Sequence, residues 1–261
     1  MWSAKGGSGT SVVSAALAVV AARSRPTLLV DFGRDQPAVL GMGSDAVVEP
    51  ASHAEPPAEP HGVAEASVGL VDWLAAPSPP PDALARLEVP AGPGLSLLPT
   101  GRLVGDGHPD GPGDPGDGRR AERLDVLGRL LAADRRAVVV DVGAASHRYE
   151  PVLARAAASI LVTRACYLAL RRPIPARHVD RVVLVAEPGR ALRRRDVETA
   201  LPAPVSATVE WDPAVARAVD AGTIRRRLPR SLRALEVLLA DLPSGSDGSL
   251  ASVRSARKLG R

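Results

Sequence analysis

A glycine-rich segment at the start of the chain constrains the fold more than any other feature. Residues 4–11 read Ala-Lys-Gly-Gly-Ser-Gly-Thr-Ser, and an apolar run follows over Ser11–Ala22. A phosphate-binding loop has the pattern G-x-x-x-x-G-K-[ST] between a strand and a helix. Here Ala4 replaces the first glycine and Thr10 the lysine, whereas Gly9 and Ser11 keep their places. The segment therefore predicts a phosphate-binding loop without its usual lysine.

Glycines in such a loop let backbone N–H groups point at phosphate oxygens, and the following helix adds its positive N-terminal end. We expect the Ser11 hydroxyl to lie on Mg²⁺, and neutral Thr10 to leave phosphate charge unneutralised. The alternative, a signal peptide, is disfavoured by the glycines and by the strand pattern that follows. The expected nucleotide-binding residues are Gly6, Gly7, Ser8, Gly9, Thr10 and Ser11.

The composition limits the classes of site that the chain can build. A single cysteine, Cys166, excludes an internal disulfide and a cysteine-built metal centre, and it fits a cytoplasmic protein. The net charge is +4, and almost all positive charge is arginine, because Lys5 and Lys258 are the only lysines. Either non-specific DNA binding or a GC-rich coding sequence explains the arginine clusters, and a membrane partner is not expected.

Short apolar runs alternate with amphipathic segments along the chain. This alternation predicts an α/β fold with a doubly wound, mostly parallel sheet and helices on both faces. The expected strands are Met1–Ala4, Thr27–Asp31, Leu95–Leu98, Ala137–Asp141, Ser159–Thr163, Arg181–Ala186 and Val205–Val209. The expected helices are Gly9–Arg23, Arg119–Asp134, Val152–Ala157, Arg193–Leu201, Asp212–Asp220 and Arg230–Leu242.

We expect one α/β domain over residues 1–242. Residues 43–66 and 105–118 are rich in turn-forming residues and predict flexible insertions, and 243–261 predicts a disordered basic tail. The first strand, Met1–Ala4, is very short for the centre of such a sheet. Either this strand is truncated, or the natural start lies upstream of Met1.

Two apolar strands end in aspartate, Leu28–Asp31 and Val138–Asp141. In phosphate-loop proteins an aspartate at the carboxyl end of a strand lies beside the loop and holds the Mg²⁺ shell. Either aspartate alone has the alternative of capping a turn. Both together, in this order after the loop, predict a Mg²⁺-nucleotide site with Ser11 and Asp141 on the metal.

With these residues the chain resembles the ParA/MinD family of deviant Walker-A ATPases. The loop is similar to the family's KGGxGK[ST], with Lys5 at the signature lysine. The resemblance extends over most of the chain through Gly69–Leu74 (GLVDWL), Pro93–Gly101 (PGLSLLPTG) and the late segment Leu201–Ile224. It implies ATP bound between two subunits of a homodimer, with Lys5 reaching the partner's phosphates. It also implies catalytic roles for Lys5, Asp31 and Asp141.

The sequence departs from the family at positions that matter for hydrolysis. Thr10 replaces the loop lysine, and Gly33 replaces the aspartate that activates the attacking water; Asp35 is a weak candidate substitute. Glu187-Pro188 stands where the family often has an adenine-contacting asparagine. Phosphoryl transfer depends on positioning and charge neutralisation, so we expect weak or absent hydrolysis.

The resemblance implies an ATP-dependent dimerising factor in cell division, polar localisation or chromosome partitioning, with a protein partner not identified by the sequence. Two alternatives stay open. One is a pseudo-ATPase scaffold that no longer binds nucleotide. The other is a slow ATPase associated with DNA.

Overall fold

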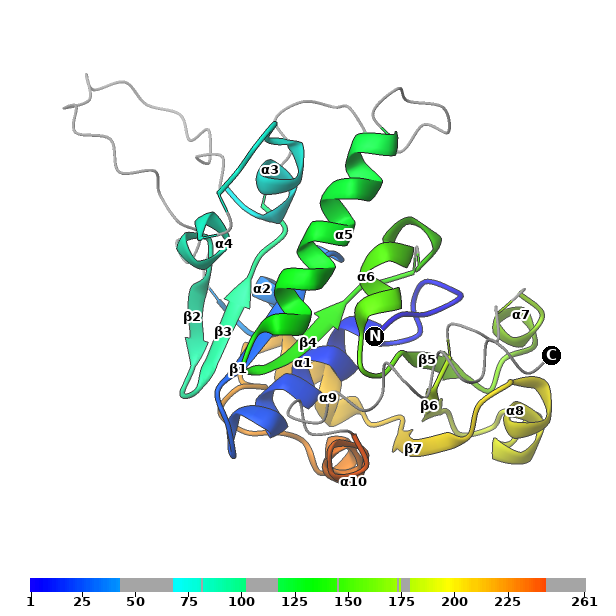
Figure 1. The fold of residues 1–261 in the computed structure, drawn as a ribbon. Coiled ribbons are helices and arrows are strands. Elements are labelled where there is room, and N and C mark those ends of the chain that lie inside the picture. Colours follow the sequence, from blue (N-terminus) through cyan, green and yellow to red (C-terminus); the bar gives the residue numbers. More distant parts are fainter. Residues whose placement is uncertain are drawn as a thin grey trace, which may run out of the picture.

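The strands form one twisted sheet that runs through the middle of the protein (Figure 1). The structure is a computed structural model and describes residues 1–42, 68–80, 82–101, 117–144, 146–172, 174 and 179–242. Its strands pair in the orders β2-β3-β1-β4 and β5-β6-β7, all parallel except the pair β2–β3. They are β1 (Thr27–Asp31), β2 (Val89–Gly92), β3 (Leu95–Leu98), β4 (Ala137–Asp141), β5 (Ile160–Arg164), β6 (Arg181–Ala186) and β7 (Val205–Glu210).

The N-terminal residues join these two groups of strands. Trp2 forms parallel bridges to Gly143, just after β4, and to Leu161 in β5. Its carbonyl accepts from the N–H of Val162 at 2.8 Å, and the N–H of Ser3 donates to the carbonyl of Gly143 at 2.9 Å. The segment therefore takes the central place predicted for strand Met1–Ala4, although only Trp2 forms bridges.

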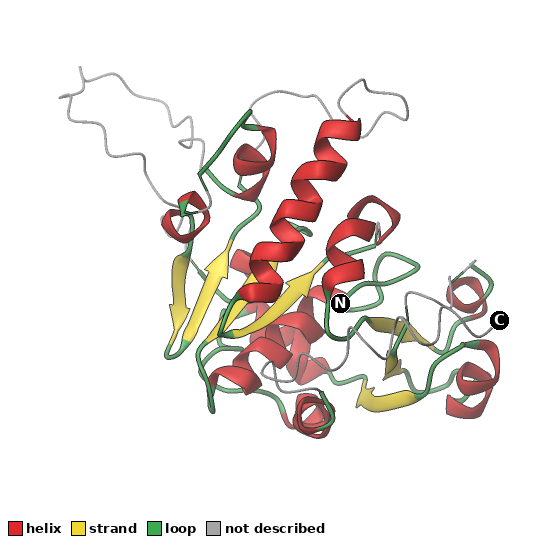
Figure 2. Cartoon of the chain, viewed as in Figure 1, coloured by secondary structure: helices red, strands yellow, loops and turns green. Residues whose placement is uncertain are grey.

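Helices cover both faces of the sheet (Figure 2). The α-helices are α1 (Thr10–Ala22), α2 (Gln36–Val39), α3 (Leu70–Ala75), α4 (Ala83–Arg86), α5 (Asp117–Ala133), α6 (Glu150–Arg155), α7 (Tyr167–Leu170), α8 (Arg194–Ala200), α9 (Pro213–Asp220) and α10 (Ala234–Ala240), with 3₁₀ turns at Ser146–Tyr149 and Arg230–Arg233. The expected doubly wound α/β architecture is confirmed.

Strand β1 shows why the apolar runs are continuous rather than alternating. All five of its residues are buried. Leu28 and Val30 belong to the apolar cluster with Leu124 and Leu127 of α5, whereas Leu29 lies in the cluster that includes α1 and α10. A strand covered on both faces needs apolar side chains at every position, because neither face meets water.

Several boundaries differ from those expected. Helix α5 begins at Asp117, so it takes the last two residues of the predicted insertion 105–118. Helix α6 covers Glu150–Arg155 rather than Val152–Ala157, and Arg230–Leu242 divides into a 3₁₀ turn and α10. Strand β2 and the short helices α2, α3, α4 and α7 were not predicted.

Residues 43–66, 105–116 and 243–261, which carry the predicted insertions and tail, lie outside the described residues. Among the helices in the described part of the chain, none has the length and apolar character needed to cross a membrane.

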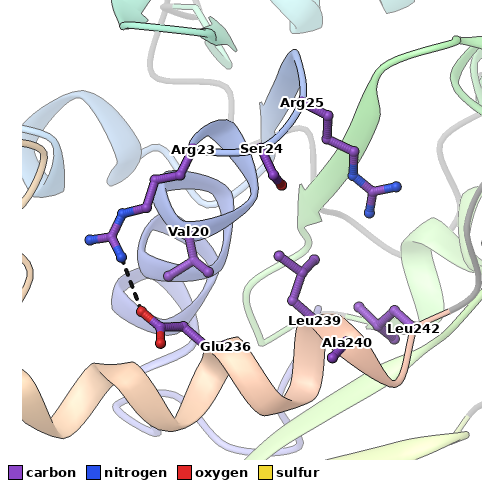
Figure 3. Close-up of a pocket in the computed structure, with 8 residues that line it drawn as sticks. All are labelled: Val20, Arg23, Ser24, Arg25, Glu236, Leu239, Ala240 and Leu242. Carbon is purple, nitrogen blue, oxygen red and sulfur yellow. Dashed lines mark hydrogen bonds and ion pairs between the residues drawn. The ribbon is translucent and has the colours of Figure 1, made fainter.

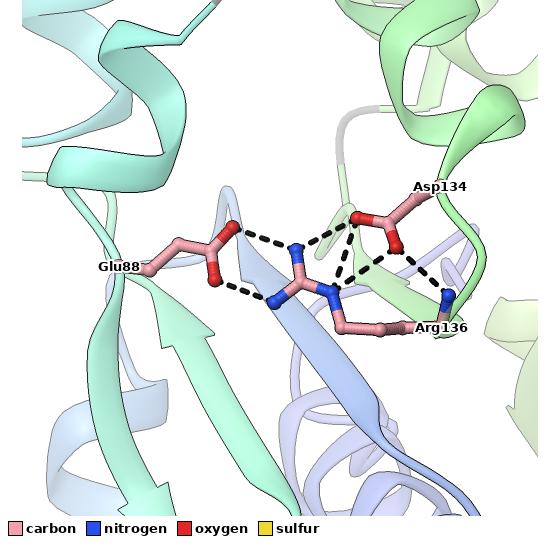
Figure 4. Close-up of polar contacts among 3 residues, drawn as sticks. All are labelled: Glu88, Asp134 and Arg136. Atoms are coloured by element: carbon pink, nitrogen blue, oxygen red, sulfur yellow. Dashed lines mark hydrogen bonds and ion pairs between the residues drawn. The ribbon is translucent and has the colours of Figure 1, made fainter.

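Arg136 joins the residue that precedes β2 to the turn that precedes β4 (Figure 4). Its guanidinium donates to both carboxylate oxygens of Glu88, at 2.6 and 2.8 Å, and also to Asp134. The hydrogen bonds from Arg136 lower the pKa of Asp134. All three side chains are at most 29% exposed, so this cluster is shielded better than an ordinary surface ion pair.

We predict that Arg136→Ala lowers the free energy of unfolding by about 1–3 kcal/mol, because it leaves two partly buried carboxylates without their shared cation. Urea unfolding would measure the change. The control is Arg86→Ala, which removes an ion pair with Asp82 whose side chains are about 70% exposed. We expect the control to change stability by less than about 0.5 kcal/mol. Equal effects of the two substitutions would contradict the prediction.

Candidate phosphate-binding site

The glycine-rich loop leaves the sheet at Ser3 and enters α1 at Thr10. Gly7 and Gly9 have φ angles of 76° and 87°, in the left-handed region that favours glycine. The Ser8 hydroxyl donates to the carbonyl of Lys5 at 2.7 Å and closes the loop on itself. A Cβ added at Gly6 or Gly7 would meet no atom within 4 Å, so the crest of the loop is open.

The loop presents the positive end of α1. Gly9 is the N-cap of this helix, and no side chain caps its first turn. The N–H groups of a helix's first turn have no acceptor within the helix, and together with the helix dipole they attract an anion. The predicted strand–loop–helix arrangement is therefore present, with its N–H groups available to a ligand.

Thr10 and Lys5 distinguish this loop from a standard phosphate-binding loop, and the two side chains differ in burial and in contacts. Thr10 is 6% exposed, and its hydroxyl has no hydrogen-bond partner within the described residues. Lys5 is half-buried, and its ammonium donates to the carbonyl of Gly6 at 3.4 Å. Lys5, the one lysine among the described residues, thus lies over the loop's own backbone.

The two strand-end aspartates are neighbours in the sheet. Asp31 and Asp141 are register partners in the parallel pair β1–β4, and both are fully buried. Asp31 accepts from the backbone N–H groups of Gly33 at 2.9 Å, Arg34 at 2.8 Å and Gln36 at 3.3 Å. Burial, followed by the charge of Asp141, nevertheless raises the pKa of Asp31 from 3.8 to about 7.

Oxygen atoms from three segments converge beside Gly33. A Cβ added there would lie 3.3 Å from Asp141 Oδ2, 3.6 Å from Asp31 Oδ1 and 3.6 Å from Ser11 Oγ. Three of the predicted site residues, Ser11, Asp31 and Asp141, are thus brought to one point. We call this place the oxygen cradle. Its carboxylate and hydroxyl donors are of the type that Mg²⁺ prefers.

Gln36 also belongs to the site, although sequence reasoning did not select it. This fully buried side chain donates from Nε2 to Asp141 Oδ2 at 2.7 Å and to the carbonyl of Ser11 at 3.0 Å. A signal was present in the sequence, because Gln36 is the only glutamine in the chain and there is no asparagine. Rarity alone, however, says nothing about position.

Two further residues considered from the sequence lie outside the oxygen cradle. Asp35 is exposed and accepts from Ser11 Oγ at 3.4 Å, a long contact. Glu187, at the end of β6, pairs with Arg164 at 2.5 Å and also with Arg190. Within the described residues, no group of three or more His, Cys, Asp or Glu side chains is arranged to hold a metal ion.

A cavity of about 490 Å³ lies far from this site, between the C-terminal end of α1 and α10 (Figure 3). Its rim carries the ion pair Arg23–Glu236 at 3.0 Å, and its apolar wall includes Val20 and Leu239. Helix α1 has 13 residues, which corresponds to about 20 Å between its ends. The cavity is therefore separate from the phosphate-binding loop.

Comparison with known proteins identifies the fold. No protein-family model and no curated protein matches the chain. Among solved structures, a ParA family ATPase from Chlorobium tepidum TLS is 19% identical, with a TM-score of 0.60 over 91% of this chain and 93% of that chain. The chain has the ParA/MinD fold.

Two other structures agree with this result. The MinD protein from Pyrococcus horikoshii OT3, solved with Mg-ADP, is 16% identical, with a TM-score of 0.61 over 97% of this chain and 99% of that chain. The MinC:MinD complex from Aquifex aeolicus gives 15% identity and a TM-score of 0.61 over 92% and 94%. The fold expected from the family resemblance is confirmed.

We predict that the raised pKa of Asp31 makes stability depend on pH. The folded state binds a proton that the unfolded state has already lost, so the free energy of unfolding falls as pH rises from about 4 to about 7. Asp31→Asn should reduce this loss by about 1–4 kcal/mol. Chemical unfolding at several pH values measures it, with exposed Asp35→Asn as the control. An unchanged slope in Asp31→Asn would show that the carboxyl of Asp31 is ionised throughout.

Proposed function

We propose that the protein is a member of the ParA/MinD family that binds ATP with Mg²⁺ at the glycine-rich loop. The observation that carries this proposal is the oxygen cradle, where Ser11, Asp31 and Asp141 converge beside the start of α1. The fold of the Pyrococcus horikoshii MinD solved with Mg-ADP supports it. The first turn of α1 and the residues Gly6, Gly7, Ser8, Gly9, Thr10 and Ser11 would hold the phosphates.

The donors in the oxygen cradle fit the metal. Ser11 and Asp141 would hold the Mg²⁺ shell, and the bound ion would neutralise phosphate charge. Two fully buried carboxylates side by side are costly, and burial followed by the charge of Asp141 raises the pKa of Asp31. A divalent cation would relieve that cost, so the electrostatics favour occupation of the site.

We propose weak or absent hydrolysis. Thr10 is neutral and buried, so it adds no charge at the phosphates. Gly33 carries no carboxylate to orient water, and a Cβ added there would lie 3.3 Å from Asp141 Oδ2. Asp35, the substitute considered from the sequence, is exposed and contacts the Ser11 hydroxyl. Nucleotide would then act mainly as a switch for dimerisation and for a protein partner, in a positioning or regulatory role.

A second candidate is a pseudo-ATPase scaffold that binds no nucleotide. The observation that favours it is Gln36, whose amide already satisfies Asp141 without a cation. A slow, DNA-associated ATPase has less support. Two arginines of the C-terminal clusters are engaged within the chain, because Arg194 donates to Glu198 and Arg225 donates to the carbonyls of Ala91 and Gly41.

Calorimetric titration with ATP and Mg²⁺ tests the main proposal. We expect the wild-type protein to bind, and Asp141→Ala to weaken binding by about tenfold or more in Mg²⁺, because it removes an oxygen from the cradle. The control, Asp82→Ala, removes an aspartate whose side chain is 70% exposed and should change affinity by less than about twofold. No heat of binding in the wild-type protein would favour the scaffold instead.

A second measurement addresses Lys5. We predict that Lys5→Ala abolishes ATP-dependent dimerisation while monomer stability is retained, because the hydrogen bond of the half-buried Lys5 ammonium to the carbonyl of Gly6 is long, at 3.4 Å, and adds little to the fold. Mass measurement in solution with and without ATP reads this directly. Lys258→Ala, at the chain's other lysine, is the control. Dimer formation by Lys5→Ala in ATP would remove the proposed role of Lys5 across the subunit interface.

A further inference from the structure

The side chain of Gln36 makes two hydrogen bonds that bind separate parts of the site together. Nε2 donates both to Asp141 Oδ2 at the end of β4 and to the carbonyl of Ser11 in the first turn of α1. Because both partners are acceptors, only the amide nitrogen can face them, which fixes the orientation of the group. Its Oε1 is consequently left buried without a hydrogen-bond partner within the described residues.

The acceptor on Asp141 is also part of the oxygen cradle. Oδ2 is the same atom that lies 3.3 Å from a Cβ added at Gly33. The amide of Gln36 therefore lies against one of the two buried carboxylates. No side-chain cation of the described residues bonds to either carboxylate, and the N-terminal ammonium of Met1, which interacts electrostatically with Asp141, donates its hydrogen bond to the carbonyl of Val140 instead. A hydrogen bond to a charged acceptor is stronger than a hydrogen bond between two neutral groups.

The backbone around Gln36 is held independently of its side chain. Its N–H donates to Asp31 Oδ2, and the end of α2 is fastened by Arg225, which donates to the carbonyl of Gly41 at 3.0 Å. A Cβ added at Gly41 would lie 2.2 Å from the Cα of Gly222, so the two backbones are in close contact. A change confined to the Gln36 side chain should leave α2 in place.

We propose that Gln36 is a positioning residue that stands in for the cation in the nucleotide-free protein. Its amide holds Asp141 Oδ2 and the first turn of α1 together, and a divalent cation in the oxygen cradle must compete with it for Asp141. Gln36 thereby lowers the contribution of Mg²⁺ to nucleotide affinity and stabilises the empty site. This inference rests on the proposed nucleotide function.

The test compares Gln36→Met, which keeps the length of the side chain and removes the donor, with Asp82→Asn as the control, because the side chain of Asp82 is 70% exposed and contacts none of the cradle residues. For each protein, the ADP dissociation constant is measured without and with Mg²⁺. The readout is the constant without Mg²⁺ divided by the constant with Mg²⁺, so a larger ratio means that Mg²⁺ contributes more to affinity. We expect this ratio to rise by about tenfold in Gln36→Met, because a hydrogen bond to a charged oxygen no longer opposes the cation. The melting temperature without ligand should fall.

A purely structural role predicts a different pattern. Gln36→Met would then lower the melting temperature and weaken ADP binding equally with and without Mg²⁺. An unchanged ratio would overturn the proposal, as would an unchanged melting temperature. The control Asp82→Asn, on an exposed side chain that pairs only with Arg86 among the described residues, should leave the ratio at the wild-type value.

A second variant needs no nucleotide. Gln36→Glu would set a third carboxylate beside Asp141, at the position where the amide nitrogen now lies 2.7 Å from Oδ2. We expect this variant to melt at a lower temperature than the wild type at pH 7, and Mn²⁺ alone to raise its melting temperature more than that of the wild type. No such gain with Mn²⁺ would count against the proposal. If the wild type binds no ADP, the proposed function fails while this arm still decides the role of Gln36.

Discussion

The hydrogen bonds of a three-residue segment hold the two halves of this protein together. Trp2 and Ser3 bond to β5 on one side and to Gly143 on the other, so the strands β1–β4 and β5–β7 form one sheet. The indole of Trp2 is 2% exposed and donates to Ser159 at 2.9 Å, which anchors the segment further. The glycine-rich loop follows directly. Its position beside the carboxyl ends of β1 and β4 depends on this anchorage.

The site is dominated by the cost of burying two like charges. Parallel pairing of β1 and β4 sets Asp31 opposite Asp141, and both residues are fully buried. Backbone N–H groups donate hydrogen bonds to Asp31, and the Gln36 amide donates one to Asp141, which offsets part of this cost. In the function proposed above, the full positive charge of a bound cation would replace the partial charges of these N–H groups and of the Gln36 amide.

Much of the fold and part of the site were predictable. The long apolar runs and the order of loop, Asp31 and Asp141 are local patterns, and they led to the correct architecture. The four-residue helices α2, α4 and α7 were missed, because so short a helix has too few positions for a periodic signal and forms through tertiary packing. Strand β2 was missed because Pro90 and Gly92 interrupt any strand pattern.

Alone, the sequence determined the strands other than β2, the glycine loop without its lysine, and the carboxylates at the strand ends, since each depends on neighbours along the chain. Tertiary structure decided the rest. It placed Asp31 level with Asp141, buried Thr10, and carried Gln36 to an acceptor 105 residues away in the chain. Strand register and burial arise from contacts between distant segments. They bring the two carboxylates together away from solvent, and this placement determines how much negative charge the site can carry.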